Sequence, residues 1–246
     1  MKATHFTKIF FFLAITATVF FACKKEVEIY LPEQTDLSSK AFIKVYNSVI
    51  NTTRNYVYID DVPITGAGLA YSALFPSVSY YSAIDAGNRA VVIKDTLKTS
   101  TQKPISFSST FDAGANYTIF TYDTVTNTKY LAVKDNIEEP ADTTSRLRLA
   151  NLVFSTSTVP NIDIYSVKQK ANIFTNVGTA QVTDFIAFSS GLPDTLFVRA
   201  TGTTTNLAQL NALTPTQKRS YTIVFRGRYA NTTGTMARTL SSFTTY

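Results

Sequence analysis

The sequence repeats a pattern of short strand-like segments at a nearly constant spacing. Tyr117-Thr118-Ile119 recurs as Tyr221-Thr222-Ile223, and Asn47 recurs as Asn151, in both cases 104 residues later. Three further matches lie at offsets of 104 or 105: Ala83 and Gly87 with Ala187 and Gly191, Val57 and Ile59 with Ile162 and Ile164, and Val91, Ile93 and Lys94 with Leu196, Val198 and Arg199. Such self-similarity predicts a tandem repeat of a domain of about 100 residues.

The segments inside each repeat are typical of β-strands. Phe42–Tyr46 and Tyr117–Tyr122 alternate in side-chain character and are rich in Val, Ile, Thr, Tyr and Phe, which is the pattern of a strand with one buried face. The best helix candidate is short, Asn206–Leu213, and ends before Pro215. About seven to eight short strands per repeat predict an all-β protein of two tandem β-sandwich domains, of the immunoglobulin or transthyretin type.

The predicted organisation has five parts, separated by changes in composition. Residues 138–145 are polar and acidic and contain a proline, which is typical of a linker. The parts are a signal peptide at 1–22, a lipid anchor and tether at 23–40, a first β-sandwich domain at 41–137, the linker at 138–145 and a second β-sandwich domain at 146–246.

The N-terminal segment has the composition of an export signal. Lys2 and Lys8 accompany an apolar run of 13 residues, Ile9–Phe21, which is shorter than the roughly 20 residues of a membrane-spanning helix. Ala22 and the only cysteine, Cys23, follow. This order resembles the bacterial lipoprotein signal, in which the chain is cut before the cysteine and a lipid such as palmitate is attached to it. A plain signal peptide and a buried N-terminal strand are the alternatives.

The resemblance implies a cell-envelope protein that is anchored in a membrane. Cys23 is followed by Lys24. An Asp at this position would resemble the inner-membrane retention signal of some Gram-negative bacteria. We therefore expect a lipid anchor in the outer membrane, with the protein facing either the periplasm or the cell surface.

The composition predicts a protein without catalytic residues, metal or cofactor. The only histidine, His5, and the only cysteine, Cys23, both lie in or directly after the predicted leader, so the mature chain lacks a histidine base and Cys/His metal ligands. Two carboxylate pairs occur, Asp60-Asp61 and Glu138-Glu139. Because neighbours on a strand point to opposite faces, adjacency alone does not bring either pair together at one bond. The first pair follows a predicted strand and precedes Val62-Pro63, so we expect it to lie in a turn, and we expect the second pair to be solvated in the linker.

The charge distribution and the tyrosines give the only indications of a partner. Residues 24–144 carry a net charge of −3 and residues 145–246 a net charge of +7, which fits either an anionic glycan partner or a solvated surface. Four tyrosines near predicted strands and loops are candidate ligand-binding residues, because aromatic rings stack on sugars and anchor protein interfaces. They are Tyr56, Tyr58, Tyr80 and Tyr81. The alternative is that they only pack on the sheets. We expect glycans or envelope proteins as partners, and no nucleic acid.

Four Asp-Thr pairs resemble the O-glycosylation signal of some exported Gram-negative proteins. The candidate acceptors are Thr96, Thr124, Thr143 and Thr195. We expect Thr124 and Thr143 to be exposed in a turn and the linker, and Thr96 and Thr195 to be less accessible beside strands. The alternative is that the Asp-Thr pairs close turns by local hydrogen bonds.

The repeated motifs together resemble the domain of unknown function 4397. The first repeat supplies Asn47-Ser48, Ile84-Asp85-Ala86-Gly87 and Tyr117-Thr118-Ile119, and the second supplies Asn151, Ile162-Asp163-Ile164-Tyr165, Ser190-Gly191, Tyr221-Thr222-Ile223 and Gly227. Such domains occur in secreted and lipid-anchored bacterial proteins, often in tandem, and the resemblance implies no activity. The sequence therefore predicts a non-catalytic envelope lipoprotein that serves as a structural, adhesion or ligand-binding module. The alternative is a glycan-binding component of a polysaccharide uptake system.

Overall fold

The computed structural model describes residues 36–246. The predicted signal peptide, Cys23 and most of the predicted tether lie outside the described residues. Within the described range every regular element is a β-strand, and the strands form four sheets. This confirms the all-β prediction.

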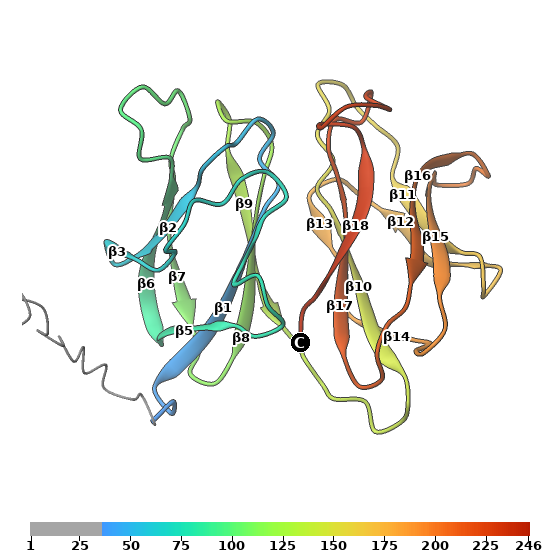
Figure 1. The fold of residues 1–246 in the computed structure, drawn as a ribbon, viewed down its shortest axis with the longest axis horizontal. Helices are drawn as coiled ribbons and strands as arrows, with labels where there is room; N and C mark the ends of the chain where they lie inside the picture. Colours follow the sequence, from blue (N-terminus) through green and yellow to red (C-terminus); the bar gives the residue numbers. More distant parts are fainter. Residues whose placement is uncertain (1–35) are drawn as a thin grey trace, which may run out of the picture. The chain divides into compact units, whose positions relative to one another are not determined.

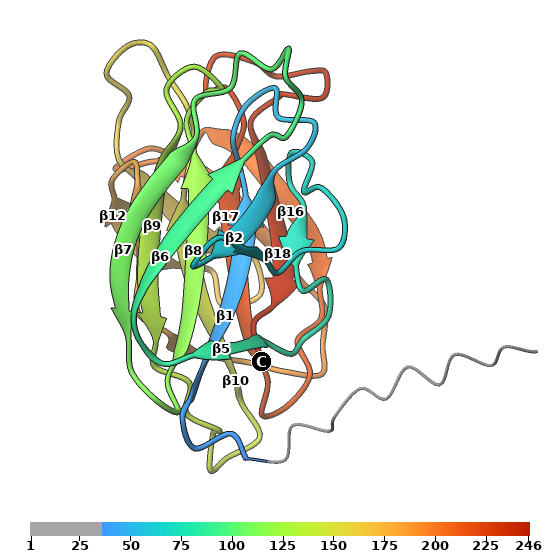
Figure 2. The ribbon, with the colours of Figure 1, turned by 90° about the vertical axis from the view of Figure 1, so that its left-hand side faces the viewer.

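The strands of the first half run from Lys40 to Asp135 and form two sheets. They are β1 (Lys40–Asn47), β2 (Tyr56–Ile59), β3 (Val62–Pro63), β4 (Leu74–Phe75), β5 (Ser82–Asp85), β6 (Gly87–Lys94), β7 (Ile105–Phe111), β8 (Asn116–Tyr122) and β9 (Lys129–Asp135). The inner sheet has the order β4-β1-β8-β9 with β5 also paired to β1, and the outer sheet has the order β3-β2-β6-β7. Figure 2 shows the outer sheet in front of the inner sheet.

The second half repeats this arrangement from Ser145 to Thr244. Its strands are β10 (Ser145–Asn151), β11 (Ile162–Ser166), β12 (Ala171–Val177), β13 (Gln181–Val182), β14 (Ile186–Phe188), β15 (Asp194–Ala200), β16 (Asn206–Leu213), β17 (Ser220–Arg226) and β18 (Thr239–Thr244). The inner sheet is β13-β10-β17-β18 with β14 on β10, and the outer sheet is β12-β11-β15-β16. The chain thus forms two sandwich-like halves, as predicted.

The strand registers confirm that the repeat in the sequence is a repeat in the structure. In each half the first strand pairs parallel with the eighth: Ile43 lies opposite Tyr117 in the first half, and Leu147 lies opposite Tyr221 in the second. Both partners are related by the same offset of 104 residues. Residues separated by this offset therefore occupy equivalent places on the inner sheets.

The helix candidate at Asn206–Leu213 is not a helix, because this segment forms the strand β16. It is an edge strand that pairs only with β15, through a register with two irregularities. Its Leu, Ala, Gln and Asn composition suits a helix as well as a strand. However, intrinsic propensity is a weak prior, and the chance to pair with β15 and cover the core outweighs it.

Each inner sheet is buried on both faces. Along β1, Ile43 and Val45 face the core of the first half, whereas Tyr46 belongs to a separate cluster with Phe120, Ala150 and Val224. This second cluster combines residues of both halves, so it marks the contact between the two inner sheets, which we call the junction. Figure 1 shows the two inner sheets facing each other. Residues 36–246 form a single compact unit.

Candidate functional site

Two buried cations lie at the junction, at equivalent places in the repeat. Lys44 on β1 and Arg148 on β10 are separated by 104 residues, and they are 0% and 1% exposed. Strand alternation explains their position, since each follows a residue that faces the core of its own half, Ile43 or Leu147. Lysine and arginine are almost never fully buried without partners, so both side chains require hydrogen-bond or ionic partners inside the protein.

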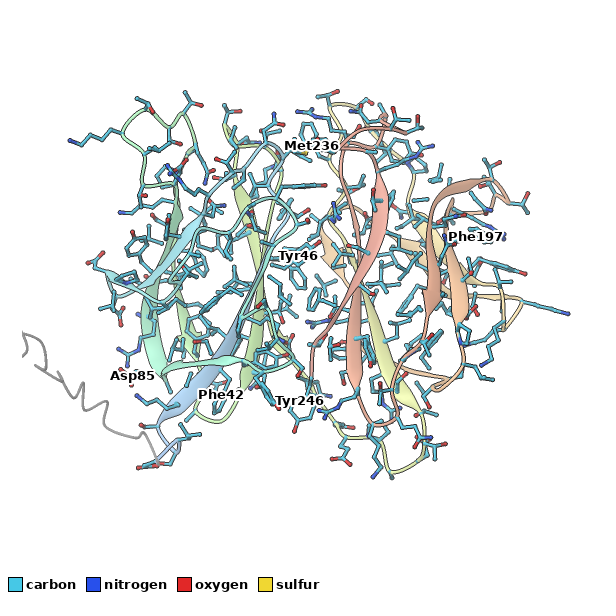
Figure 3. The ribbon with its side chains drawn as sticks, in the orientation of Figure 1. Phe42, Tyr46, Asp85, Phe197, Met236 and Tyr246 are labelled. Atoms are coloured by element: carbon cyan, nitrogen blue, oxygen red, sulfur yellow. The ribbon has the colours of Figure 1, made fainter. Side chains whose placement is uncertain are left out.

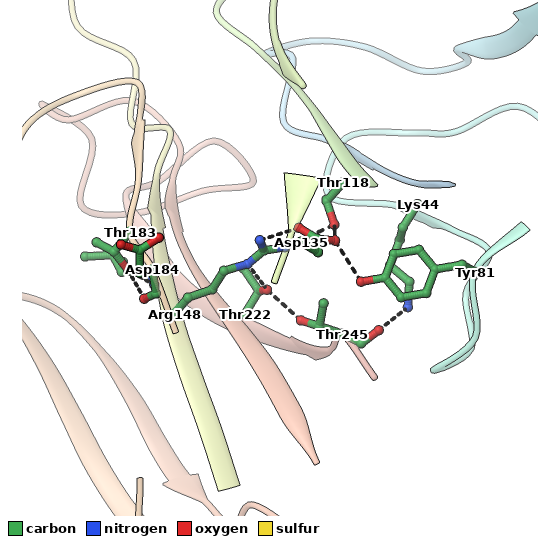
Figure 4. Close-up of polar contacts among 10 residues, drawn as sticks. Lys44, Tyr81, Thr118, Asp135, Arg148, Thr183, Asp184, Thr222 and Thr245 are labelled. Atoms are coloured by element: carbon green, nitrogen blue, oxygen red, sulfur yellow. Dashed lines mark hydrogen bonds and ion pairs between the residues drawn. The ribbon is translucent and has the colours of Figure 1, made fainter. Parts of the chain in front are cut away.

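Arg148 reaches from the second half to the end of β9 in the first half. Its Nη1 donates to Asp135 Oδ1 at 2.5 Å, its Nη2 donates to Thr118 Oγ1 at 3.0 Å, and its Nε donates to Thr222 Oγ1 at 2.8 Å. The side chains of Arg148 and Asp135 are 1% and 0% exposed. This is a fully buried ion pair between the halves (Figure 4).

The carboxylate of Asp135 has hydrogen-bond donors on both oxygens. Its Oδ2 accepts from Thr118 Oγ1 at 2.5 Å and from Tyr81 Oη at 2.7 Å, while Oδ1 accepts from Arg148. Burial, followed by the negative charge of Asp135, raises the pKa of Tyr81, so this phenol remains a neutral donor. The carboxylate of Asp135 therefore acts as a structural hydrogen-bond acceptor.

Lys44 reaches in the opposite direction, from the first half to the end of β18. Its Nζ donates to the carbonyl oxygens of Val78 and Thr245 at 3.1 Å and of Thr244 at 3.3 Å. The same Nζ lies 4.7 Å from the ring centre of Tyr81. Burial lowers the pKa of Lys44 to about 8; Asp135 acts against this change and Arg148 adds to it. Two cations thus share the single carboxylate of Asp135.

An aromatic pocket of about 290 Å³ lies beside this network. We use "aromatic pocket" for the hollow lined by Phe42, Tyr80, Tyr81, Gly114, Asn116 and Tyr246. Both halves contribute to it, and Figure 3 shows Phe42 and Tyr246 at the same end of the junction. Tyr80 is 72% exposed and Tyr246 43% exposed, and Val78 in the Tyr80 loop is also exposed. The structure therefore gathers apolar and aromatic surface at this place.

The structure separates the four candidate tyrosines into two pairs. Tyr80 and Tyr81 line the aromatic pocket. Tyr56 and Tyr58 lie on β2 of the outer sheet, where they alternate with buried Val57 and Ile59 and are only partly buried. The ring of Tyr58 is covered by Lys94 Nζ at 4.8 Å. Of the four, only Tyr80 and Tyr81 lie beside the buried network at the junction.

Asn47, which recurs as Asn151 in the second repeat, has a structural role. Its Nδ2 donates to the carbonyls of Leu69 and Ala70 at 2.8 and 3.0 Å, and its Oδ1 accepts from Thr121 Oγ1 at 2.9 Å and from Asn55. Its equivalent, Asn151, donates to Val177 O at 3.1 Å. The asparagine therefore ties the end of the first strand to the segment before β4 in the first half and to the end of β12 in the second, which accounts for it without a ligand.

The two predicted carboxylate pairs lie where the sequence indicates. Asp60 and Asp61 form the turn between β2 and β3, with positive φ angles of 48° and 65°. Asp60 accepts a hydrogen bond from the amide of Ala90 and pairs with Arg89 at 3.0 Å, and these two contacts lower the pKa of its carboxyl group. Glu138 and Glu139 are exposed between β9 and β10. Among the described residues, no group of three or more His, Cys, Asp or Glu side chains is placed to hold a metal ion.

The glycosylation candidates differ in accessibility. Thr143 is exposed as expected, but Thr124 is only partly exposed. Thr96 is exposed, contrary to expectation, because β6 ends at Lys94; Thr195 is partly buried within β15. Asp95 accepts from the amide of Leu97 at 2.9 Å and Asp142 accepts from that of Thr144 at 2.9 Å, which supports the turn-closing alternative for these pairs. Glycosylation stays a prediction.

Sequence reasoning missed Lys44 and Arg148. The signal that could have found them is a cation in the middle of an otherwise apolar strand, repeated at the same place in both halves. The described part of the chain contains no helix that is long and apolar enough to cross a membrane.

Comparison with known families confirms the resemblance for part of the chain. Residues 41–159 match the family model of the domain of unknown function DUF4397. The match covers the strands of the first half from Ala41 onward and continues through β10. A search of curated proteins found no significant match.

Proposed function

We propose that this protein is a non-catalytic ligand-binding module of the cell envelope, held at the outer membrane by a lipid on Cys23. The observation that carries the ligand-binding role is the aromatic pocket, which Tyr80, 72% exposed, lines together with Phe42, Tyr81 and Tyr246. Large exposed aromatic surface is costly in water and commonly marks a binding site.

The polar groups next to the pocket support a binding role over a catalytic one. Both oxygens of Asp135 accept hydrogen bonds from buried donors, and Lys44 donates to three carbonyls. A general acid or base must instead be free to exchange a proton with a bound substrate. The network therefore serves to hold the walls of the pocket in place.

The same pocket favours a second candidate function, a glycan-binding component of a polysaccharide uptake system. Aromatic rings can pack on the apolar face of a sugar ring, and the Asn116 side chain at the pocket can bind hydroxyl groups. A structural or adhesion partner would instead cover the rim around Val78, Tyr80 and Tyr246, all of which are exposed. Binding of soluble sugars distinguishes the two roles.

Replacing Tyr80 by alanine is expected to weaken sugar binding about tenfold, or about 1.4 kcal/mol. The measurement is isothermal titration calorimetry of the full-length protein with a panel of neutral and acidic oligosaccharides. The matched control is Tyr58→Ala, which removes a tyrosine from the outer sheet and leaves the pocket unchanged. Equal affinities for wild type and Tyr80→Ala, or a loss confined to Tyr58→Ala, would place the site elsewhere. A panel without any binder would argue for the structural or adhesion role.

Replacing Cys23 by serine is expected to release the protein from the membrane fraction or to leave its leader uncut. The reason is that the several acyl chains of a lipoprotein hold a protein firmly, whereas one chain gives only marginal binding. Membrane fractionation and the intact mass of the protein measure both effects. If the variant is cut and still sediments with membranes as the wild type does, another segment provides the anchor.

A further inference from the structure

The aromatic pocket has a counterpart at the equivalent positions of the second half, where residues 133–138 also contribute to the lining. The offset of 104 residues relates Phe42 to Arg146, Lys44 to Arg148, Tyr80 to Asp184 and Tyr81 to Phe185. The side-chain geometry agrees, because Arg148 lies 4.6 Å from the centre of the Phe185 ring just as Lys44 lies 4.7 Å from that of Tyr81. Two of the aromatic residues are thus replaced by a guanidinium and a carboxylate.

The residues at the counterpart positions line a real hollow. We call it the charged pocket; its lining includes Lys134, Glu138, Arg146, Arg148, Asp184 and Phe185, and its volume is about 120 Å³. A single water molecule needs only about 10–15 Å³ of such space. The charged pocket therefore has room for a small organic molecule.

The arginines of the charged pocket retain unused hydrogen-bond donors. Arg146 is held by bonds from its Nη1 to Thr144 Oγ1 at 2.8 Å and to the carbonyl of Ser145 at 3.3 Å. Its Nε and Nη2 have no partner among the described residues. Arg148 is 1% exposed, and only three of the five N–H donors of its guanidinium have partners. Paired guanidinium donors of this kind suit a carboxylate.

The acidic side of the charged pocket has no counter-ion among the described residues. Asp184 and Glu138 are both exposed and form no ion pair there, although Arg146 lines the same hollow. Lys134 is already engaged with Asp112 at 2.8 Å. Asp184 would repel a simple anion, and the arginines would repel a simple cation. A ligand that carries both charges satisfies both sides.

We propose that the charged pocket binds a small zwitterionic molecule of the α-amino acid class. Its carboxylate would bind Arg146 and Arg148, and its ammonium group would bind Asp184. This site is separate from the aromatic pocket, so it does not depend on sugar binding there.

The test is titration calorimetry of the full-length protein with glycine, L-alanine and L-serine, and with acetate and methylamine as ligands of one charge. We expect saturable binding of at least one amino acid, with acetate and methylamine at least tenfold weaker. Arg146→Gln and Asp184→Asn should each weaken binding at least tenfold. Arg219→Gln, a change at an exposed arginine outside the pocket lining, should leave it unchanged.

Three results would overturn the proposal. The first is no saturable binding of any of the three amino acids. The second is binding that survives Arg146→Gln and Asp184→Asn unchanged. The third is acetate binding as tightly as the amino acids, which would make the hollow a plain anion site. Asp184 is exposed, so Asp184→Asn is expected to fold normally, and thermal unfolding of each variant separates loss of binding from loss of structure.

Discussion

Replacing Asp135 by asparagine is expected to lower the free energy of unfolding by about 3–5 kcal/mol. The change removes the carboxylate that pairs with Arg148 and acts on Lys44, both of which are almost completely buried. The amide NH2 would also replace one carboxylate oxygen, so it would face either Arg148 or the pair Tyr81 and Thr118, which donate to that oxygen in the native protein. Denaturant unfolding measures the loss, and the melting temperature should fall by roughly 6–20 °C.

Two companion variants identify the cause of that loss. Glu139→Gln breaks the pair of Glu139 with Lys218, whose side chains are 59% and 52% exposed, and it should change stability by less than about 1 kcal/mol. Adding Lys44→Met to Asp135→Asn removes one of the two unpaired cations, and it should recover part of the loss. An Asp135→Asn protein as stable as Glu139→Gln would show that the buried pair contributes nothing to folding.

Separating the two halves is expected to abolish the cooperative unfolding of each. A fragment of residues 36–141 would expose Tyr46 and Phe120 to water and remove two of the three carbonyl acceptors of Lys44. A fragment of residues 142–246 would leave Arg148 without Asp135. The polar segment between the halves would by itself suggest independent domains, but these contacts favour mutual dependence. Thermal unfolding of each fragment, followed by circular dichroism, is the measurement.

The control is co-expression of the two fragments from separate genes. They should elute as one complex, with an unfolding transition close to that of the intact chain, because the junction and not the connecting segment holds them together. If either fragment alone unfolds sharply near the midpoint of the intact chain, the junction is not required for folding.

The sandwich fold could be predicted because its determinants are local in the sequence. Alternation in segments such as Tyr117–Tyr122 reports one buried face, and the constant offset reports that the fold is built twice. The strand at Asn206–Leu213 could not be recognised, because its residues suit a helix and only its pairing with β15 decides the outcome. Tertiary contacts of this kind have no local signature.

The candidate site was predicted only in part. Tyr80 and Tyr81 were recognised as aromatic residues near a loop, and they do line a pocket. Alternation does not reveal the second buried face of the inner sheets, because this pattern predicts one buried and one solvated face. The junction buries both faces, so Lys44 and Arg148 occupy positions where the pattern predicts solvent.

The crossed reach of the two cations has a consequence for the order of folding. Lys44 lies near the start of the first half, yet two of its acceptors, Thr244 and Thr245, are 200 and 201 residues further along the chain. Contacts between such distant residues form late, since closing a long loop costs entropy before the contact is gained. The first half can therefore pair its own strands early, but Lys44 and the second face of its inner sheet are covered only after β18 of the second half is in place, so it becomes stable only then. A chain that emerges from one end first would pass through an intermediate with an exposed sheet face, and its final step would be the docking of the halves.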